Sequence, residues 1–558
     1  MKRYIRGFGI GLVAVTLAVT ACAPAEETDP GAAVGEGDAG AESDVGESKG
    51  EREVGGSIIV ALEAETPGWS PWGETQAQSG VLVSNAFFDT LLERDADGVP
   101  QPNLAESIEP NNEFTQYTLV LRDGIEFHDG EPLDAEAVVA NIEQHREPGS
   151  VTGGAVAPIE DVTAEDELTV VFILDQPHVA FADVLVGSAG RMVSPAAFDT
   201  VSDEPVGAGP FVFESWQRDQ ELVVSRNENY WRDDKPYLEQ ITFRPIPDED
   251  ARLQSLFAGD VDVMQTLRQS IVAQARERAD EFNHYEHIGN DAGGVILNTA
   301  VPPFDDVRVR QAWAHAINQD ELIEVLGGTG ITPPAHGLFS PDSPWYDPEM
   351  ADVWPDEDVE RARELLDEYV EDPERSDGQE PGAPVSVELD TPPDPSLLEI
   401  SSVYQAQLAR IDMKIDIRTV EQAVHVQQAV GEPPEFIGDY QAKLWRLGSE
   451  ADPDWMMAGF ADGSPTNFTS FHSEELMGLL LEARQSPEFE ERKALYNQAM
   501  RLFAEEVPFT FSGFTATLLA TDPALFGFDD WELPDGEPGV GHPESVARWH
   551  SVWLDGPE

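Results

Sequence analysis

The sequence predicts an α/β fold that is divided into two or three domains. The chain has 558 residues, more than one hydrophobic core normally organises, and 41% of them are apolar. Residues 117–142 alternate in hydrophobicity with period 2 and then change to helical spacing. Residues 383–420 show a strand, a helix and a second strand in succession, which is typical of a βαβ unit.

The N-terminal residues are typical of an export signal. Lys2, Arg3 and Arg6 precede an apolar run, and the only cysteine, Cys22, ends the stretch VTAC. This stretch resembles the lipobox of bacterial lipoproteins, in which the chain is cut before the cysteine and its thiol carries a diacylglycerol. We therefore expect a signal peptide over residues 1–21 and a lipid on Cys22. The alternatives are an uncleaved membrane anchor and a buried structural cysteine.

An acidic, disordered tether is predicted over residues 22–54. Residues 23–54 contain ten acidic and two basic residues, many Gly, Ala and Ser, and no aromatic, so they cannot form a core. GEGDAG and GESKG within this segment match a dinucleotide-binding loop and a nucleophile elbow by letters alone. Neither lies between a strand and a helix, as both kinds of site require.

Residues 117–142 raise the question of a metal or proton-transfer site, because several acids surround His128. The alternation predicts a strand, two Asp-Gly pairs predict turns, and Asp134 is placed to cap a following helix. His128 and Asp129 are neighbours at a strand end and therefore point to opposite faces. We expect turn and cap roles for these acids.

Further elements are predicted on both sides of this segment. Residues 56–62 read as a strand, and residues 359–369 as a helix with Ala362, Leu365 and Tyr369 on one face. The following loop, residues 370–384, is long and charged, so we expect it at the surface.

Several motifs resemble the bacterial extracytoplasmic solute-binding protein family 5, the peptide/nickel-type receptors of ABC importers. They are LLERDADGVPQPNLAES (91–107), LRDGIEFHDGEPLDA (121–135), PVGAGPFVFESW (205–216), RNENYW (226–231), RLQSLFAGDVDV (252–263) and LNTAVPPFDDVRVRQAWAHAIN (297–318). They occur in the family's order, and the resemblance extends from about residue 56 to the C-terminus. Ala137 departs from the pattern, since the family usually has Asp there.

The resemblance implies a two-lobed periplasmic-binding-protein-like fold with a hinge, a cleft and an inserted subdomain. Lobe I would contain residues 55–88, 205–291 and 509–558, with the insertion at 89–204 and lobe II at 292–508. The implied function is a lipid-anchored, extracytoplasmic monomer that delivers a peptide or similar solute to an ABC permease and its ATPase. A surface sensor or adhesin and a secreted hydrolase are the alternatives.

Two loops supply candidate ligand contacts. Trp69 and Trp72 follow the first strand and either stack on a ligand or cover a core. Residues 443–457 correspond to a family loop that reaches the ligand, where an Asp of peptide-binding members pairs with the peptide amine. Gly448 or Ser449 takes that position here, and Glu450 or Asp452 would have to replace the charge. The remaining candidates are Trp445, Trp455 and Arg446, the last for a carboxylate or phosphate or else for an ion pair with a nearby acid.

Charge and motif content argue against some other functions. A net charge of −74, from 107 acidic and 33 basic residues, argues against nucleic acid as a partner. The acidity is accounted for by solubility in a salty medium or by a basic partner. His284 and His287 lie in an extended stretch on opposite faces, so we expect no metal site. No catalytic motif has the context its chemistry needs, which argues against a hydrolase, and the resemblance implies a binding protein without a cofactor.

Overall fold

The computed structural model describes residues 52–431, 436–447, 452–541 and 546–556. Cys22, Gly448, Ser449 and Glu450 lie outside these ranges, as do the expected signal peptide and most of the tether, so those assignments stay predictions. Within the described ranges, no helix combines the length and the apolar character that crossing a membrane requires.

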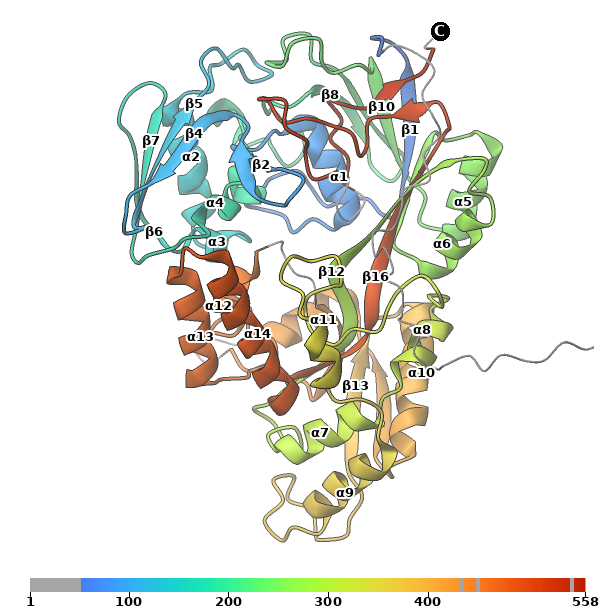
Figure 1. The fold of residues 1–558 in the computed structure, drawn as a ribbon. Helices are drawn as coiled ribbons and strands as arrows, with labels where there is room; N and C mark the ends of the chain where they lie inside the picture. Colours follow the sequence, from blue (N-terminus) through green and yellow to red (C-terminus); the bar gives the residue numbers. More distant parts are fainter. Residues whose placement is uncertain (1–51, 432–435, 448–451, 542–545, 557–558) are drawn as a thin grey trace, which may run out of the picture. The chain divides into compact units, whose positions relative to one another are not determined.

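Helices and strands are interspersed along the described chain, with several runs of consecutive strands or helices (Figure 1). The helices are α1 (Gln78–Phe87), α2 (Ala135–Arg146), α3 (Gly153–Val156), α4 (Phe181–Val184), α5 (Glu249–Ala258), α6 (Gln269–Arg276), α7 (Val307–Ala316), α8 (Gln319–Val325), α9 (Val359–Val370), α10 (Pro395–Ala409), α11 (Gln422–Val430), α12 (Met456–Gly459), α13 (Glu474–Gln485) and α14 (Phe489–Glu506), with short 3-10 turns η1 (Ser188–Gly190), η2 (Pro195–Ala197), η3 (Pro348–Asp352) and η4 (Pro453–Trp455). The strands are β1 (Ser57–Leu62), β2 (Leu92–Arg94), β3 (Pro100–Pro102), β4 (Ala105–Pro110), β5 (Gln116–Leu121), β6 (Ile159–Ala164), β7 (Thr169–Leu174), β8 (Phe211–Gln217), β9 (Glu221–Arg226), β10 (Gln240–Pro245), β11 (Val263–Thr266), β12 (Asn283–Leu297), β13 (Ser386–Thr391), β14 (Lys414–Thr419), β15 (Ala442–Leu447), β16 (Phe509–Thr521), β17 (Leu525–Phe526) and β18 (Trp553–Leu554).

One mixed sheet links the described parts of the chain. Its ten strands run in the order β14-β13-β15-β12-β16-β11-β1-β10-β9-β8. The long strands β12 and β16 pair antiparallel at its centre (Figure 1). On one side of them β1 lies parallel to β10 and β11, and on the other side β13 lies parallel to β14 and β15. The predicted α/β class is confirmed.

Buried apolar side chains of the described residues form five clusters. Two surround the β1 half of the sheet, and two surround the β13 half, drawing on residues 292–514. The fifth, from residues 91–208, lies on the four-stranded sheet β4-β5-β7-β6. We refer below to the β1 half as the first lobe and the β13 half as the second lobe; the lobe boundaries given above stay predictions.

The turn-and-cap interpretation of residues 117–142 is confirmed. Asp134 accepts a 2.8 Å hydrogen bond from the Ala137 N–H and so caps α2. The Gly207 N–H donates to Nδ1 of His128 over 3.3 Å, and Nε2 lies 2.9 Å from the Gly209 carbonyl. The ring is therefore neutral with its proton on Nε2, and burial lowers its pKa to about 4.

The predicted βαβ unit and the helix before it are also confirmed. β13 and β14 pair parallel with Ser386 opposite Lys414, and α10 connects them. In α9 the predicted apolar face is buried. The loop between α9 and β13 is mostly exposed, as expected, but it folds around a buried Arg375. This guanidinium donates to the Val370 and Ala383 carbonyls and pairs with Asp377.

Candidate ligand-binding site between the two lobes

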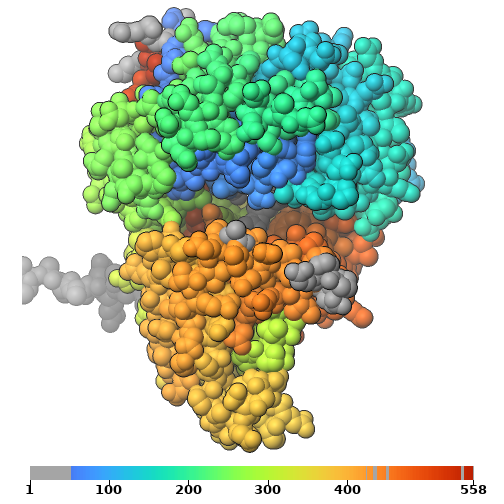
Figure 2. All heavy atoms as spheres, turned by 180° about the vertical axis from the view of Figure 1, so that it is seen from behind, coloured from blue at the N-terminus to red at the C-terminus, as the bar shows by residue number. Residues whose placement is uncertain are grey.

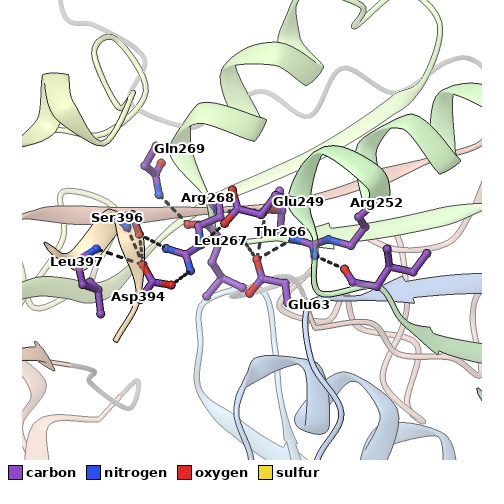
Figure 3. A network of polar contacts seen from close by, with 11 residues as sticks. Glu63, Glu249, Arg252, Thr266, Leu267, Arg268, Gln269, Asp394, Ser396 and Leu397 are labelled. Carbon is purple, nitrogen blue, oxygen red and sulfur yellow. Dashed lines mark hydrogen bonds and ion pairs between the residues drawn. The ribbon is translucent and has the colours of Figure 1, made fainter. Parts of the chain in front are cut away.

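The position of the candidate site is inferred from the carboxyl ends of the parallel strands. In open α/β sheets, ligands bind beyond the carboxyl ends of the strands. In the first lobe β1, β10 and β11 end at Leu62, Pro245 and Thr266, and in the second lobe β13, β14 and β15 end at Thr391, Thr419 and Leu447. Arg268, just after β11, donates to Asp394 and Ser396, just after β13 (Figure 3). The two sets of strand ends therefore face each other, and the space-filling view shows a recessed band between the two lobes (Figure 2).

The end of β15 presents an aromatic ring and a cation. Trp445 is half-buried, stacks on His425 with ring centroids 5.6 Å apart, and contacts Phe468 at 4.9 Å. Arg446 pairs with Asp291 on the neighbouring strand β12, while 51% of its side chain is exposed. The ion pair is one of the two roles expected for Arg446.

The acids that follow β15 are held by arginines. Asp452 accepts from the Asp454 N–H at the start of η4, and Nη2 of Arg492 lies 2.8 Å from both of its carboxylate oxygens. Burial raises the pKa of Asp452 to about 6, against the opposing effect of Arg492. Asp452, one of the two acids considered for a peptide amine, is therefore engaged with Arg492.

Asp454 is held in the same way. Arg484 donates to both of its oxygens at 2.8 and 2.6 Å, and the His178 ring lies 3.1 Å away. Burial acts to raise the pKa of Asp454, but the hydrogen bonds from His178 and Arg484 outweigh it and hold the pKa below its usual range. The adjacent Trp455 is half-buried beside Phe460, at a ring distance of 6.3 Å.

The two tryptophans after β1 pack into the first lobe. Trp69 is only 3% exposed and lies 5.4 Å from Phe87 and 5.0 Å from Trp216, measured between ring centroids. Trp72 is half-buried and meets Phe198 edge-on at 5.1 Å. These are the contacts of residues that cover a core; a ligand-stacking role for either stays a prediction.

Sequence reasoning missed two charged groups near the strand ends. The first is Arg268 with its partners across the lobes. The second is Lys443, which is fully buried and donates to Asp390 over 2.8 Å, while Arg418 binds the same carboxylate at 2.6 and 2.8 Å. Alternation along β13 places Asp390 on the same face as Ser386 and Glu388, which are exposed, so no local pattern indicates this buried ion pair.

Comparison with known proteins agrees with this geometry. The family model for bacterial extracellular solute-binding proteins, family 5 (Middle) matches residues 99–468. The chain is 27% identical over 505 residues to the glutathione-binding protein GsiB of Escherichia coli strain K12, covering 86% of this chain and 92% of that protein. The same values hold for GsiB of Shigella boydii serotype 4.

Solved structures share the two-lobed fold. The binding protein AgaA of A. tumefaciens R10, in complex with agropinic acid, superposes with a TM-score of 0.76 at 25% identity, covering 90% of this chain and 99% of AgaA. The oligopeptide-binding protein AppA of Bacillus subtilis, in complex with a nonapeptide, gives 0.75 at 22% identity and covers 90% and 100%. The predicted fold is confirmed. The chain belongs to the bacterial extracellular solute-binding proteins of family 5 and is the substrate-binding component of an ABC importer.

Proposed function

We propose that this protein is a lipid-anchored receptor that captures a peptide or similar organic solute between its lobes and delivers it to an ABC permease and its ATPase. The observation that carries the proposal is the meeting of two sets of parallel strand ends across the Arg268–Asp394 contact. Such a receptor works by closing two lobes on a solute. The protein acts as a monomer on the extracytoplasmic side, without covalent chemistry.

The ligand proposed is neutral or anionic, with a flat or apolar part. Trp445 offers an aromatic surface at the end of β15, and Arg446 offers a half-exposed guanidinium beside it. Trp455, Ser449 and Glu450 remain proposed contacts from the same loop, with Trp69 and Trp72 from the first lobe. Relatives that bind glutathione, agropinic acid and a nonapeptide support a small peptide or peptide-like acid.

Capture and uptake are tested together. Small molecules released by denaturing the natively purified protein are identified by mass spectrometry, and uptake of that solute is measured in a deletion strain. We expect one dominant solute whose uptake is lost on deletion and restored by the wild-type chain. Unchanged uptake, with binding intact, would instead favour the sensor or adhesin function, and no bound solute would contradict capture.

Lipid attachment is tested at Cys22. Because this is the only thiol of the chain and ends a lipobox-like run, Cys22→Ser should leave an unprocessed or soluble product. Membrane fractionation and mass spectrometry of the N-terminus measure the outcome. Wild-type protein found equally in the soluble fraction with an intact Met1 would contradict the lipoprotein assignment.

A further inference from the structure

Arg268 makes its contacts from a rigid position in the first lobe. Glu63 accepts the Leu267 N–H over 2.9 Å (Figure 3). The Gln269 side chain donates to the Ala516 carbonyl on β16 over 3.1 Å. The residues on both sides of Arg268 are thereby anchored, one to the residue that follows β1 and the other to β16. The guanidinium then extends between Glu249 on its own lobe and the start of α10 on the other lobe.

Three groups share this one guanidinium. Nε lies 2.7 Å from Glu249, Nη1 donates to the Ser396 hydroxyl over 2.7 Å, and Nη2 lies 3.1 Å from Asp394. The side chains of Arg268, Glu249 and Asp394 are 35%, 34% and 33% exposed. Each charge is therefore partly solvated even while the contact is made.

Both sides of the contact keep a partner when the lobes separate. Arg268 retains Glu249, which lies in the same lobe. Asp394 retains its role as the cap of α10, where it accepts from the Ser396 and Leu397 N–H groups at 2.9 and 3.1 Å. Opening therefore leaves none of these charged groups without a partner. A contact of this kind forms and breaks reversibly.

The negative charge of the protein increases the effect that this contact has on lobe closure. The chain carries 107 acidic and 33 basic residues, so we expect electrostatic repulsion to oppose the approach of the two lobes. Without Arg268, the carboxylates of Glu249 and Asp394 would face each other across the gap. The guanidinium replaces that repulsion with attraction on both sides.

We propose that Arg268 is a positioning residue that holds the two lobes closed by bridging Glu249 to the Asp394–Ser396 start of α10. The contact sets the ratio of closed to open molecules before any solute binds. It therefore also determines how far the binding of a solute still has to shift that ratio toward the closed state. This inference rests on the two-lobed fold and not on the identity of the solute.

The closed-to-open ratio is measured in the ligand-free full-length chain by spin-label distance distributions. Labels go on exposed positions of the two lobes, Gln254→Cys on α5 and Ser402→Cys on α10, in a Cys22→Ser background that leaves no other thiol. We expect two distance populations. Arg268→Gln should lower the closed-to-open ratio about fivefold, as expected for a partly exposed, multiply hydrogen-bonded ion pair.

Two further variants assign the effect to the contact itself. Asp394→Asn keeps a good helix cap while removing the charge, so it should shift the ratio by a similar factor in a folded protein. Arg268→Gln and Asp394→Asn together should shift it no further than either alone, because they remove the same contact. If Arg268→Gln failed to fold, Asp394→Asn would still test the bridge.

A matched ion pair within one lobe provides the control. Arg410 lies 2.7 Å from Glu357, with side chains 34% and 31% exposed, and both belong to the second lobe. Arg410→Gln should leave the ratio unchanged. The proposal is overturned if Arg268→Gln and Asp394→Asn both leave the ratio within twofold of wild type, or if Arg410→Gln shifts it equally. A ligand-free wild-type protein without a closed population would also overturn it.

Discussion

Replacing Arg492 with methionine is expected to lower the free energy of unfolding by about 3–5 kcal/mol, because it leaves a buried carboxylate without its partner. Arg492 contacts both oxygens of Asp452, and the two side chains are 10% and 9% exposed. Methionine has a similar length and an apolar end, so the effect reports the lost charge more than lost volume. Urea denaturation followed by circular dichroism measures it.

The pH dependence of this variant has a defined sign. Burial already raises the folded pKa of Asp452 to about 6, above its unfolded value, and removal of Arg492 raises it further. The protonated form therefore stabilises the folded state in acid, and that stability is lost as the pH rises through the folded pKa. The loss of unfolding free energy caused by Arg492→Met should be smaller at pH 5 than at pH 8.

Two controls separate the buried pair from general effects on α14. Arg501→Met removes a more exposed pair on the same helix, Arg501 with Asp347 at 36% and 20% exposure, and should cost about 1 kcal/mol or less. Adding Asp452→Asn to Arg492→Met should recover much of the lost stability, because no charge is then buried alone. A loss below about 1 kcal/mol for Arg492→Met itself would contradict the interpretation.

Peptides with a free α-amine are expected to bind at least tenfold more weakly than their N-acetylated counterparts. The resemblance implies that Gly448 or Ser449 stands where peptide-binding members of the family have an Asp that pairs with the amine. The next described acids are engaged, Asp452 with Arg492 and Asp454 with Arg484. A buried ammonium without a carboxylate loses its hydration with no compensation. Calorimetry with a short-peptide library in free and acetylated forms tests this.

Glu450 is the residue that could reverse this prediction. Its sequence position, beside Ser449, would allow it to supply the missing charge. Micromolar or tighter binding of free-amine peptides, abolished by acetylation and by Glu450→Gln, would show that Glu450 has taken over the amine site. Glu482→Gln, an exposed acid on α13, is the control for a general loss of negative charge.

Elements whose stabilising groups are neighbours in the chain were predictable. The period of 3.6 residues predicted α9 because its buried face is formed by residues three and four positions apart. Asp134 was recognised as a cap because its partner N–H is three residues away. The motifs also identified the family, since many of them are such turns, caps and strand ends, in a set order.

The candidate site was only partly predictable. Trp445 and Arg446 are predicted contacts because residues 443–457 resemble a family loop that reaches the ligand, and the structure places both near the end of β15. Their role in binding stays a prediction. For the tryptophans after β1, aromatic residues in a loop that follows a strand are consistent either with stacking on a ligand or with covering a hydrophobic core. Only the packing of Trp69 against Phe87 and Trp216 shows which contacts it makes here.

The sequence by itself determined the α/β class, the local turns and caps, and the family. The tertiary structure decided which charges meet. Arg268 and Asp394 are separated by 126 residues, as Arg446 and Asp291 are by 155. Among 107 acids, each of the 33 basic residues has many candidate partners. A cap or turn joins groups that the backbone already holds within a few residues, whereas an ion pair between lobes exists only where the folded cores bring two surfaces within about 4 Å.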